Sequence, residues 1–402
     1  MKPVYIVSWL FALAISFVSC DDWLDKTPKD RLYPDVYFKT EDELRLFTNQ
    51  FYNNLVPSAV DIYSESSDLI VKSDLMLEMS GQRIIPDEGN GWNFTALRDI
   101  NFYLQYSHNC TEVNARNRYD GVARFFRAYF YFEKVKRYGD IPWYDKALDS
   151  DDPELYKARD SREFVMQKML EDLDFAIANL PKTKNAYVLT RWTALALKSR
   201  VCLFEGTFRK YHGLEDYEKY LNACVSASET FMNESGYTLY KSGSTPYRDL
   251  FASINLQADE VIFGRDYEAS LSVLHNVQNY ENSTTMGRPG MNKKIVNSYL
   301  MADGSRFTDK AGYETMTFDQ ECQNRDPRLA QTIRTPGYTR IGSTKKEAPN
   351  LAYTMTGYHL IKYSMTANYD EYNKSCNDIP LFRTAEVYLN FAEAKAELGT
   401  LK

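Results

Sequence analysis

Two stretches of the sequence combine aromatic rings with planar polar side chains, a combination that can bind sugars. A flat aromatic face covers the apolar C–H surface of a sugar ring, while amide, carboxylate and guanidinium groups pair with its hydroxyls. The candidate ligand-binding residues are Arg83, Asp87, Asn90 and Trp92 in one stretch, and Tyr267, His275, Asn279, Tyr280 and Arg288 in the other. Core packing is the competing interpretation. It is favoured for Trp92, which begins a predicted helix, and is about even for the two tyrosines.

Catalysis finds little support among the titratable residues. None of the four histidines lies in an HExxH pattern, and the sequence has no GxSxG nucleophile elbow or phosphate-binding loop. Glu386 and Glu393 share one face of a predicted helix, but with 55 acidic residues in the chain, salt bridges explain such a pair better. We therefore predict no enzymatic activity. A surface glycosidase stays open as an alternative, and it requires two carboxylates about 5–10 Å apart in a cleft.

We expect neither a cofactor nor a metal site. The acidic run Asp149–Glu154 could hold Ca²⁺ through its carboxylates, but it lacks the glycine and the final glutamate of a calcium-binding loop. A solvated acidic turn is the favoured interpretation. No CxxC pair suggests zinc, and the five cysteines other than Cys20 are scattered as small buried hydrophobic residues would be. Cys202 and Cys224 could meet if their helices pair.

The first residues predict export and a lipid anchor. A basic start and an apolar run of about fifteen residues predict a signal peptide over residues 1–19. A cysteine at the cleavage point, here Cys20, is the bacterial lipoprotein pattern, although the preceding residues fit it loosely and an ordinary secretory peptide is the alternative. The acidic patch after Cys20 resembles an export signal of some Gram-negative surface lipoproteins. We predict lipidation of Cys20 and a tether linker over residues 20–40.

Composition narrows the possible partners. The net charge of −7 argues against a nucleic-acid partner, because phosphate binding needs clustered lysine and arginine. Aromatic residues make up 14% of the chain and include 31 tyrosines, which serve both cores and sugar stacking. About 380 residues remain after export, enough for one large domain or two ordinary ones.

Helical periodicity predicts the frame that must position the candidate groups. Capping signals and apolar stripes predict helices over 41–56, 92–107, 112–138, 192–205 and 215–233, and another between Asp160 and Pro181. Gly206 is interpreted as the signal that ends the 192–205 helix. Successive helix pairs indicate a tetratricopeptide-like stack, and therefore a mainly α fold.

Two segments predict irregular structure instead. Residues 57–90 and 234–380 are rich in small polar residues, glycine and proline. Within the second segment we expect one short helix over 293–301 and a strand at 261–263. A clean helix follows over 384–399. Loops this long inside a fold are usually functional, so the second segment is the predicted ligand lobe.

Seven short patterns, in order behind the lipoprotein signal, give the chain its family resemblance. They are Trp23–Pro28 with the helix Thr40–Leu55, Arg124–Tyr131, Tyr138–Pro142, Ala196–Val201, Tyr299–Gly304, Arg325–Leu329 and Asp378–Ala394. Each is weak alone, but in this order they resemble the SusD/RagB family of outer-membrane lipoproteins over nearly the whole chain. The resemblance implies a SusD-like domain over 41–402, divided into a helical frame (41–233), a loop-rich ligand lobe (234–380) and the start of a C-terminal helical part (381–402).

The resemblance also implies a function. Such proteins bind glycans at the outer cell surface and cover a TonB-dependent transporter barrel, to which they pass oligosaccharides without catalysis. A peptide-binding component of a similar transporter is the alternative. Family members usually continue past the late helix into a partner helix, whereas this sequence ends at Lys402. We therefore expect a truncated form in which the helix 384–399 exposes an apolar stripe.

Overall fold

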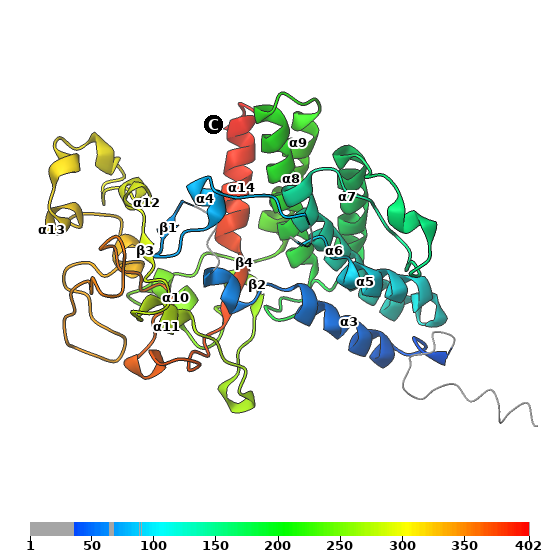
Figure 1. Cartoon of the computed structure of the whole chain (residues 1–402), viewed down its shortest axis with the longest axis horizontal. Helices are drawn as coiled ribbons and strands as arrows, with labels where there is room; N and C mark the ends of the chain where they lie inside the picture. Colours follow the sequence, from blue (N-terminus) through cyan, green and yellow to red (C-terminus); the bar gives the residue numbers. More distant parts are fainter. Residues whose placement is uncertain (1–35, 64–67, 88, 90, 402) are drawn as a thin grey trace, which may run out of the picture.

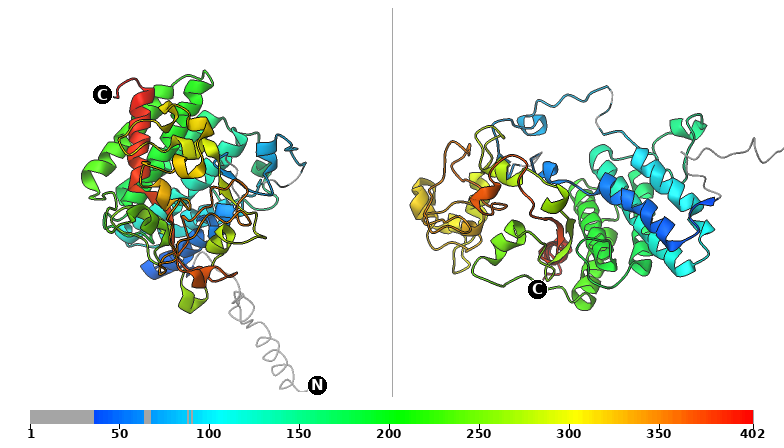
Figure 2. Two further views of the ribbon diagram at one scale, coloured as in Figure 1. Left: turned by 90° about the vertical axis from the view of Figure 1, so that its left-hand side faces the viewer. Right: turned by 90° about the horizontal axis from the view of Figure 1, so that it is seen from below.

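The computed structural model describes residues 36–63, 68–87, 89 and 91–401. It has two parts, a frame of long helices and a lobe of loops and short elements, which lie side by side along the long axis (Figure 1). Two further views show the same division (Figure 2). The predictions for the signal peptide, Cys20 and Asn90 lie outside the described residues.

The long helices are α3 (Glu41–Leu55), α5 (Thr95–Tyr106), α6 (Val113–Tyr138), α7 (Arg162–Asn179), α8 (Arg191–Tyr211), α9 (Tyr217–Glu234) and α14 (Thr384–Glu397). Three of the long helices, α3, α7 and α8, begin at a residue whose side chain caps them. Thr40 and Glu43 form a capping box at the start of α3, and Thr190 and Thr193 form another at the start of α8. Ser161 caps α7. These side chains bond the amides that a helix start leaves free, and the predicted helix starts are confirmed.

The frame is a stack of helix pairs. Helix α6 packs on α7, α8 packs on α9, and α14 lies against both α8 and α9 (Figure 1). Large aromatic side chains such as Phe125, Phe126, Tyr131 and Phe231 are buried between them. The mainly α fold with stacked helix pairs is therefore confirmed.

One buried and one partly buried ion pair join helices that are distant in the sequence. The Arg127 guanidinium donates to both carboxylate oxygens of Asp172, at 2.6 and 2.8 Å. Arg200 does the same to Glu386, at 2.5 and 2.7 Å. Bidentate pairs of this kind fix the relative positions of helices, so the interpretation of Glu386 as a salt-bridge residue is confirmed.

Two small antiparallel sheets organise the lobe. β1 (Ile70–Val71) pairs with β3 (Gly290–Met291), and β2 (Val261–Arg265) pairs with β4 (Ile379–Arg383). The short α-helices are α4 (Leu77–Ser80), α10 (Pro246–Ala252), α11 (Val277–Glu281), α12 (Lys293–Ser298) and α13 (Phe318–Glu321). Short 3-10 helices occur at Ala59–Tyr63, Ser107–Asn109, Pro153–Tyr156, Ala269–Leu271, Phe307–Asp309, Tyr313–Thr315, Leu329–Gln331 and Ala367–Tyr369. Because β1 pairs with β3, the chain after α3 crosses into the lobe.

Three details differ from the sequence predictions. Helix α8 continues to Tyr211, so Gly206 does not end it. A Cβ at Gly206 would lie 2.7 Å from Leu221, which shows that this glycine allows α8 and α9 to approach closely. The lobe contains α10, α11 and α13 besides the one helix expected there. Strand β4 was not predicted, because its partner β2 lies more than a hundred residues earlier.

The cysteines and the last helix can also be compared with the sequence predictions. All five cysteines among the described residues are free, and Cys202 and Cys224 are buried in one apolar cluster, as predicted. On α14, Val387 and Ala394 are buried while Leu389 is exposed. No helix in the described part of the chain is long and apolar enough to cross a membrane.

Candidate ligand-binding site

Tyr267 and His275, two of the predicted ligand contacts, are buried and bonded to backbone. The Tyr267 hydroxyl accepts a hydrogen bond from the Ala59 amide at 2.7 Å, and its ring is 7% exposed. His275 Nδ1 accepts from the Val277 amide at 3.1 Å, and Nε2 donates to the Asn377 carbonyl at 2.8 Å. Burial lowers the pKa of His275 to about 4, so the ring is neutral near pH 7. Neither ring presents a face to a ligand.

Asn279, Tyr280 and Arg288 also hold the lobe together. Asn279 Nδ2 donates to the Asp370 carbonyl at 2.7 Å, and Tyr280 is only 4% exposed. Arg288 donates to two carbonyls of the 351–352 turn, at 2.7 and 2.9 Å. We name these five residues of the predicted second stretch the lobe cluster. Backbone groups far away in the sequence already bond to Tyr267, His275, Asn279 and Arg288, which argues against these residues as ligand contacts, and their assignment stays a prediction.

The described residues of the first predicted stretch, Arg83, Asp87 and Trp92, are exposed. Arg83 forms an ion pair within the α4 turn, and Asp87 is exposed. Trp92 is 40% exposed, against the packing interpretation, and its ring contacts Tyr138 edge-on with 4.9 Å between ring centroids. The Arg159 guanidinium lies 5.0 Å from the centroid of the indole ring. The indole therefore has a core-facing edge and an accessible surface.

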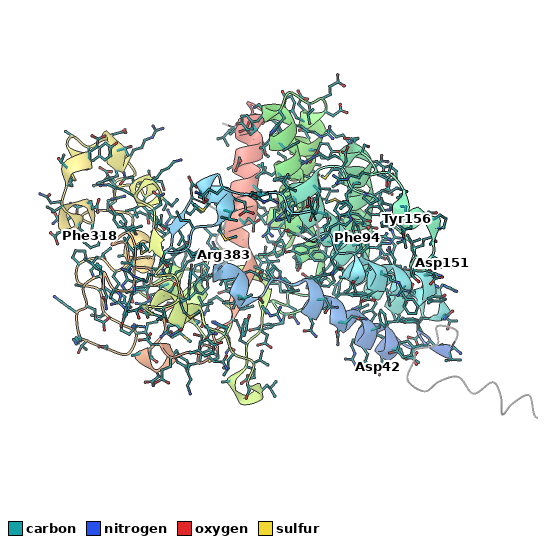
Figure 3. The ribbon with its side chains drawn as sticks, viewed as in Figure 1. Asp42, Phe94, Asp151, Tyr156, Phe318 and Arg383 are labelled. Carbon is teal, nitrogen blue, oxygen red and sulfur yellow. The ribbon has the colours of Figure 1, made fainter. Side chains whose placement is uncertain are left out.

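A cleft of about 530 Å³ opens beside this indole, and we name it the Trp92 cleft. Its walls come from the start of α5 and from the loop that follows α6. It is lined by Trp92, Phe94, Thr95, Leu97, Arg98, Asn101, Pro142, Tyr144, Lys146, Leu148, Leu155, Lys157, Ala158 and Arg159. Phe94, Asp151 and Tyr156 lie at the frame end of the molecule, opposite Phe318 of the lobe (Figure 3). An aromatic wall beside solvent is the arrangement that sugar stacking needs.

The charges that line the Trp92 cleft have one sign. Its lining includes the four cations Arg98, Lys146, Lys157 and Arg159 and, among the described residues, no carboxylate. Arg98 and Lys146 expose about half of their side chains, at 54% and 51%. For Arg159, which is exposed, the described residues contain no carboxylate within ion-pair distance. The other three cations pair with carboxylates just outside the lining, Arg98 with Asp149 at 3.9 Å, Lys146 with Glu154 at 2.9 Å and Lys157 with Asp160 at 2.9 Å. The lining itself is therefore positive, with acidic side chains next to it.

A second hollow of about 880 Å³ shares Thr95 with the Trp92 cleft, and we name it the Asp99 hollow. It is lined by Asn53, Asn54, Leu55, Val56, Pro57, Ser58, Asp61, Asn93, Thr95, Ala96, Asp99, Tyr129, Phe130, Glu133, Lys134 and Arg265. Burial raises the pKa of the Asp99 carboxyl. Arg265 donates to the Val56 carbonyl at 2.8 Å. With three carboxylates and three amides, this hollow is the polar counterpart of the cleft.

The acidic turn Asp149–Glu154 has structural partners. Asp152 accepts a hydrogen bond from the Glu154 amide at 2.9 Å, and the Glu154 carboxylate pairs with Lys146 at 2.9 Å. The part of the chain that the structure describes contains no group of three or more His, Cys, Asp or Glu side chains that could hold a metal ion. That the protein needs no cofactor stays a prediction.

Comparison with known proteins relates this fold to a family. Residues 250–402 match the model of the SusD family, and residues 81–191 match a model described as starch-binding associating with outer membrane. The chain belongs to the SusD/RagB family. The whole lining of the Trp92 cleft, from Trp92 to Arg159, lies inside the second matched segment.

Relatives within the SusD/RagB family are distant. SusD-like protein P2 of Formosa agariphila is 25% identical over 416 residues, which cover 96% of this chain and 76% of the relative. A SusD-like protein of Bacteroides fragilis superposes with a TM-score of 0.73 at 22% identity, over 94% of this chain and 79% of that chain. A SusD-like carbohydrate binding protein of the same species gives 0.69 at 18% identity, over 90% and 75%. The two solved structures support the shared fold.

Sequence reasoning found one residue of the cleft and missed its partners. Arg98 lies on α5 and Arg159 on the loop before α7, so neither stands beside Trp92 in the sequence. A faint signal existed, because the segment from Trp143 to Arg159 combines aromatic, aliphatic and basic residues within a SusD-like frame. This segment can be recognised as part of the cleft only in the folded chain, where the loop lies against the start of α5.

Proposed function

We propose that this protein captures an oligo- or polysaccharide at the cell surface and does not alter it chemically. The observation that carries the proposal is the Trp92 cleft, with an exposed indole in the segment that matches the starch-binding family model. The SusD-like carbohydrate binding protein of Bacteroides fragilis adds support through its shared fold.

In this proposal the sugar stacks and is then fixed by hydrogen bonds. The indole of Trp92 covers the C–H face of one sugar ring, and dispersion together with released water stabilises that contact. Arg98 and Lys146 reach hydroxyl or acidic oxygens with half-exposed cationic groups. Binding to preformed walls requires little reordering of the chain, since α5 and the loop after α6 are tied to the frame.

The absence of catalysis rests on the lining chemistry. A glycosidase needs a carboxyl pair, and the described lining of the Trp92 cleft contains no carboxylate or histidine. The Asp99 hollow does contain carboxylates, and a hydrolysis readout therefore belongs in the functional test. A glycosidase remains the second candidate function for that hollow only.

The cellular setting of the proposal follows from family membership. We place the chain at the outer membrane, anchored through lipid on Cys20 and facing the cell exterior. The glycan then passes to a TonB-dependent transporter barrel, with this protein as its lid. The family model that associates a matched segment with the outer membrane supports this placement. Peptide delivery to a similar transporter is the alternative.

A binding screen tests the proposal. The purified protein is run through native gels that contain single polysaccharides, and peptide pools are tested by calorimetry, with product analysis in parallel. Retention by a glycan without released sugars is the expected result. Release of shorter sugars would establish an enzyme instead. Binding of peptides without any glycan would assign the protein to peptide uptake.

A further inference from the structure

The Trp92 cleft and the protein as a whole have opposite charge. The chain carries 55 acidic and 48 basic side chains, for a net charge of −7. The described lining of the cleft nevertheless contains four cations and no carboxylate, whereas the Asp99 hollow contains three carboxylates and two cations. A concave surface of one sign concentrates ligands of the other sign, because its low-dielectric walls focus the field. The cleft is therefore suited to an anion.

Two of the four cations are held by the protein backbone. Arg98 Nε donates to the Leu148 carbonyl at 3.2 Å, and Lys157 Nζ donates to the Trp143 carbonyl at 2.7 Å. Each also pairs with a carboxylate, Arg98 with Asp149 at 3.9 Å and Lys157 with Asp160 at 2.9 Å. These contacts fix both side chains against the wall, and the Arg98 side chain is still 54% exposed. A charge held in place in this way loses little conformational entropy when a ligand arrives.

The other two cations are exposed, and each has one partner among the described residues. Lys146 is 51% exposed and pairs only with the exposed carboxylate of Glu154, a contact that water competes with strongly. Arg159 stands over the Trp92 ring, with its guanidinium carbon 5.0 Å from the centroid. A sugar that stacks on this face of the indole displaces the guanidinium, and an acidic sugar offsets that loss by forming an ion pair with Arg159, which a neutral sugar cannot do.

We infer that the Trp92 cleft binds an acidic glycan, one whose sugars carry uronate carboxylates or sulfate esters. This inference rests on the proposed capture function and specifies its substrate class. The sugar ring stacks beside the indole of Trp92, and its acidic group lies between Arg159 and Lys146. Arg159 thus links recognition of the ring to recognition of the charge.

The test compares acidic polymers with their own neutral forms. The purified protein is titrated with a polyuronate and with its carboxyl-reduced polymer, and with a sulfated polysaccharide and its desulfated polymer. We expect at least one acidic polymer to bind about tenfold more tightly than its neutral form, and to weaken when salt rises from about 50 to about 500 mM. The pair that discriminates identifies carboxylate or sulfate as the group recognised.

Matched variants locate the effect. Replacing both exposed cations, as Arg159→Gln with Lys146→Gln, is expected to reduce the affinity for the acidic polymer about tenfold or more. Lys374→Gln removes a charge from the exposed surface of the lobe and should leave affinity unchanged. Thermal unfolding checks that all variants are folded. An equal loss in the control variant would overturn the inference, because net charge alone would then explain binding.

The remaining outcomes separate this inference from the proposed function. Equal affinity for acidic and neutral forms overturns the acidic-glycan inference and leaves glycan capture in place. Binding of none of the four glycans, nor of any in the wider screen, overturns both. Polyglutamate carries the charge without sugar rings, and if it binds as tightly as the acidic polymer, the cleft recognises charge alone and the inference fails.

Discussion

The lobe cluster and the Trp92 cleft look alike in the sequence and differ in burial and in the partners of their polar atoms. Both combine aromatic rings with planar polar groups. In the lobe cluster, the polar atoms of His275 and Asn279 bond backbone carbonyls more than ninety residues away. In the cleft, the exposed cations Lys146 and Arg159 contact only an exposed carboxylate and a ring. The difference teaches that aromatic content alone does not identify a binding surface, and that exposed polar atoms which backbone does not bind must accompany it. Arg98 of the cleft lies between the two cases, because it is half exposed and donates to the Leu148 carbonyl.

The largest effect that would sharpen this comparison is the pH dependence of stability that three buried groups of the lobe contribute. Burial lowers the pKa of His275 to about 4 and that of His359 to about 3, with Arg334 also lowering the latter. An unfolded histidine binds a proton near pH 6.5, so both groups stabilise the folded state less as pH falls from 6.5 toward 4. Glu281 opposes this, because burial raises its pKa to about 7 and its contribution is lost as pH rises from 4.5 through 7.

With two histidines against one glutamate, we expect these three groups together to lower the unfolding free energy by about 3 kcal/mol between pH 7 and pH 4. Urea unfolding at several pH values measures it. A sulfate ester is a strong acid and stays ionised, so binding of a sulfated glycan should persist at pH 5 while the protein is folded. A stability that rises on acidification would show that Glu281 dominates the lobe.

A second test removes a support from the lobe cluster. His275→Ala leaves the Val277 amide and the Asn377 carbonyl without their partner in a buried position. We expect a loss of about 2–3 kcal/mol in unfolding free energy, with glycan affinity unchanged under conditions where the variant is folded. Denaturant titration and calorimetry provide the two numbers. A stable variant with weakened glycan binding would instead return His275 to the ligand site.

The distinction between these regions also marks the limit of sequence reasoning. Local signals such as the Thr40–Glu43 capping box and the Ser161 cap predict helix starts, because cap and helix are neighbours in the chain. Strand β4 and the close packing at Gly206 depend on partners elsewhere, so no local pattern identifies them. The same holds for the site. Trp92 was found from its type, but its proximity to Arg159 results from the path of α6 and the following loop.

The third test is made at the Trp92 cleft, where we expect a small loss of stability and a large loss of glycan affinity. Trp92→Ala removes a ring that is 40% exposed, so we expect a loss of less than about 1.5 kcal/mol in stability. Glycan affinity should fall about tenfold to thirtyfold, since the stacking surface is lost. Trp92→Phe keeps a smaller flat face and should retain part of the affinity. If both variants bind as the parent does, the Trp92 cleft is not the glycan site.

The smallest expected effect concerns the Asp99 hollow, which adjoins the cleft at Thr95. Asp99→Asn preserves shape and removes a carboxyl whose pKa is already raised by burial, so unfolding free energy should change by less than about 0.5 kcal/mol. If the two hollows are separate sites, affinity for an acidic glycan in the cleft should also stay within about twofold.

Asp99→Asn can also show that the Trp92 cleft and the Asp99 hollow are not separate sites. A glycan long enough to pass from the cleft into the hollow would bring its acidic groups close to Asp99, and removing that carboxylate would then strengthen binding by relieving repulsion. Calorimetry with acidic oligosaccharides of increasing length distinguishes the two cases. A gain that appears only above a certain length would join cleft and hollow into one extended site, with the start of α5 as the ridge between its positive and negative halves.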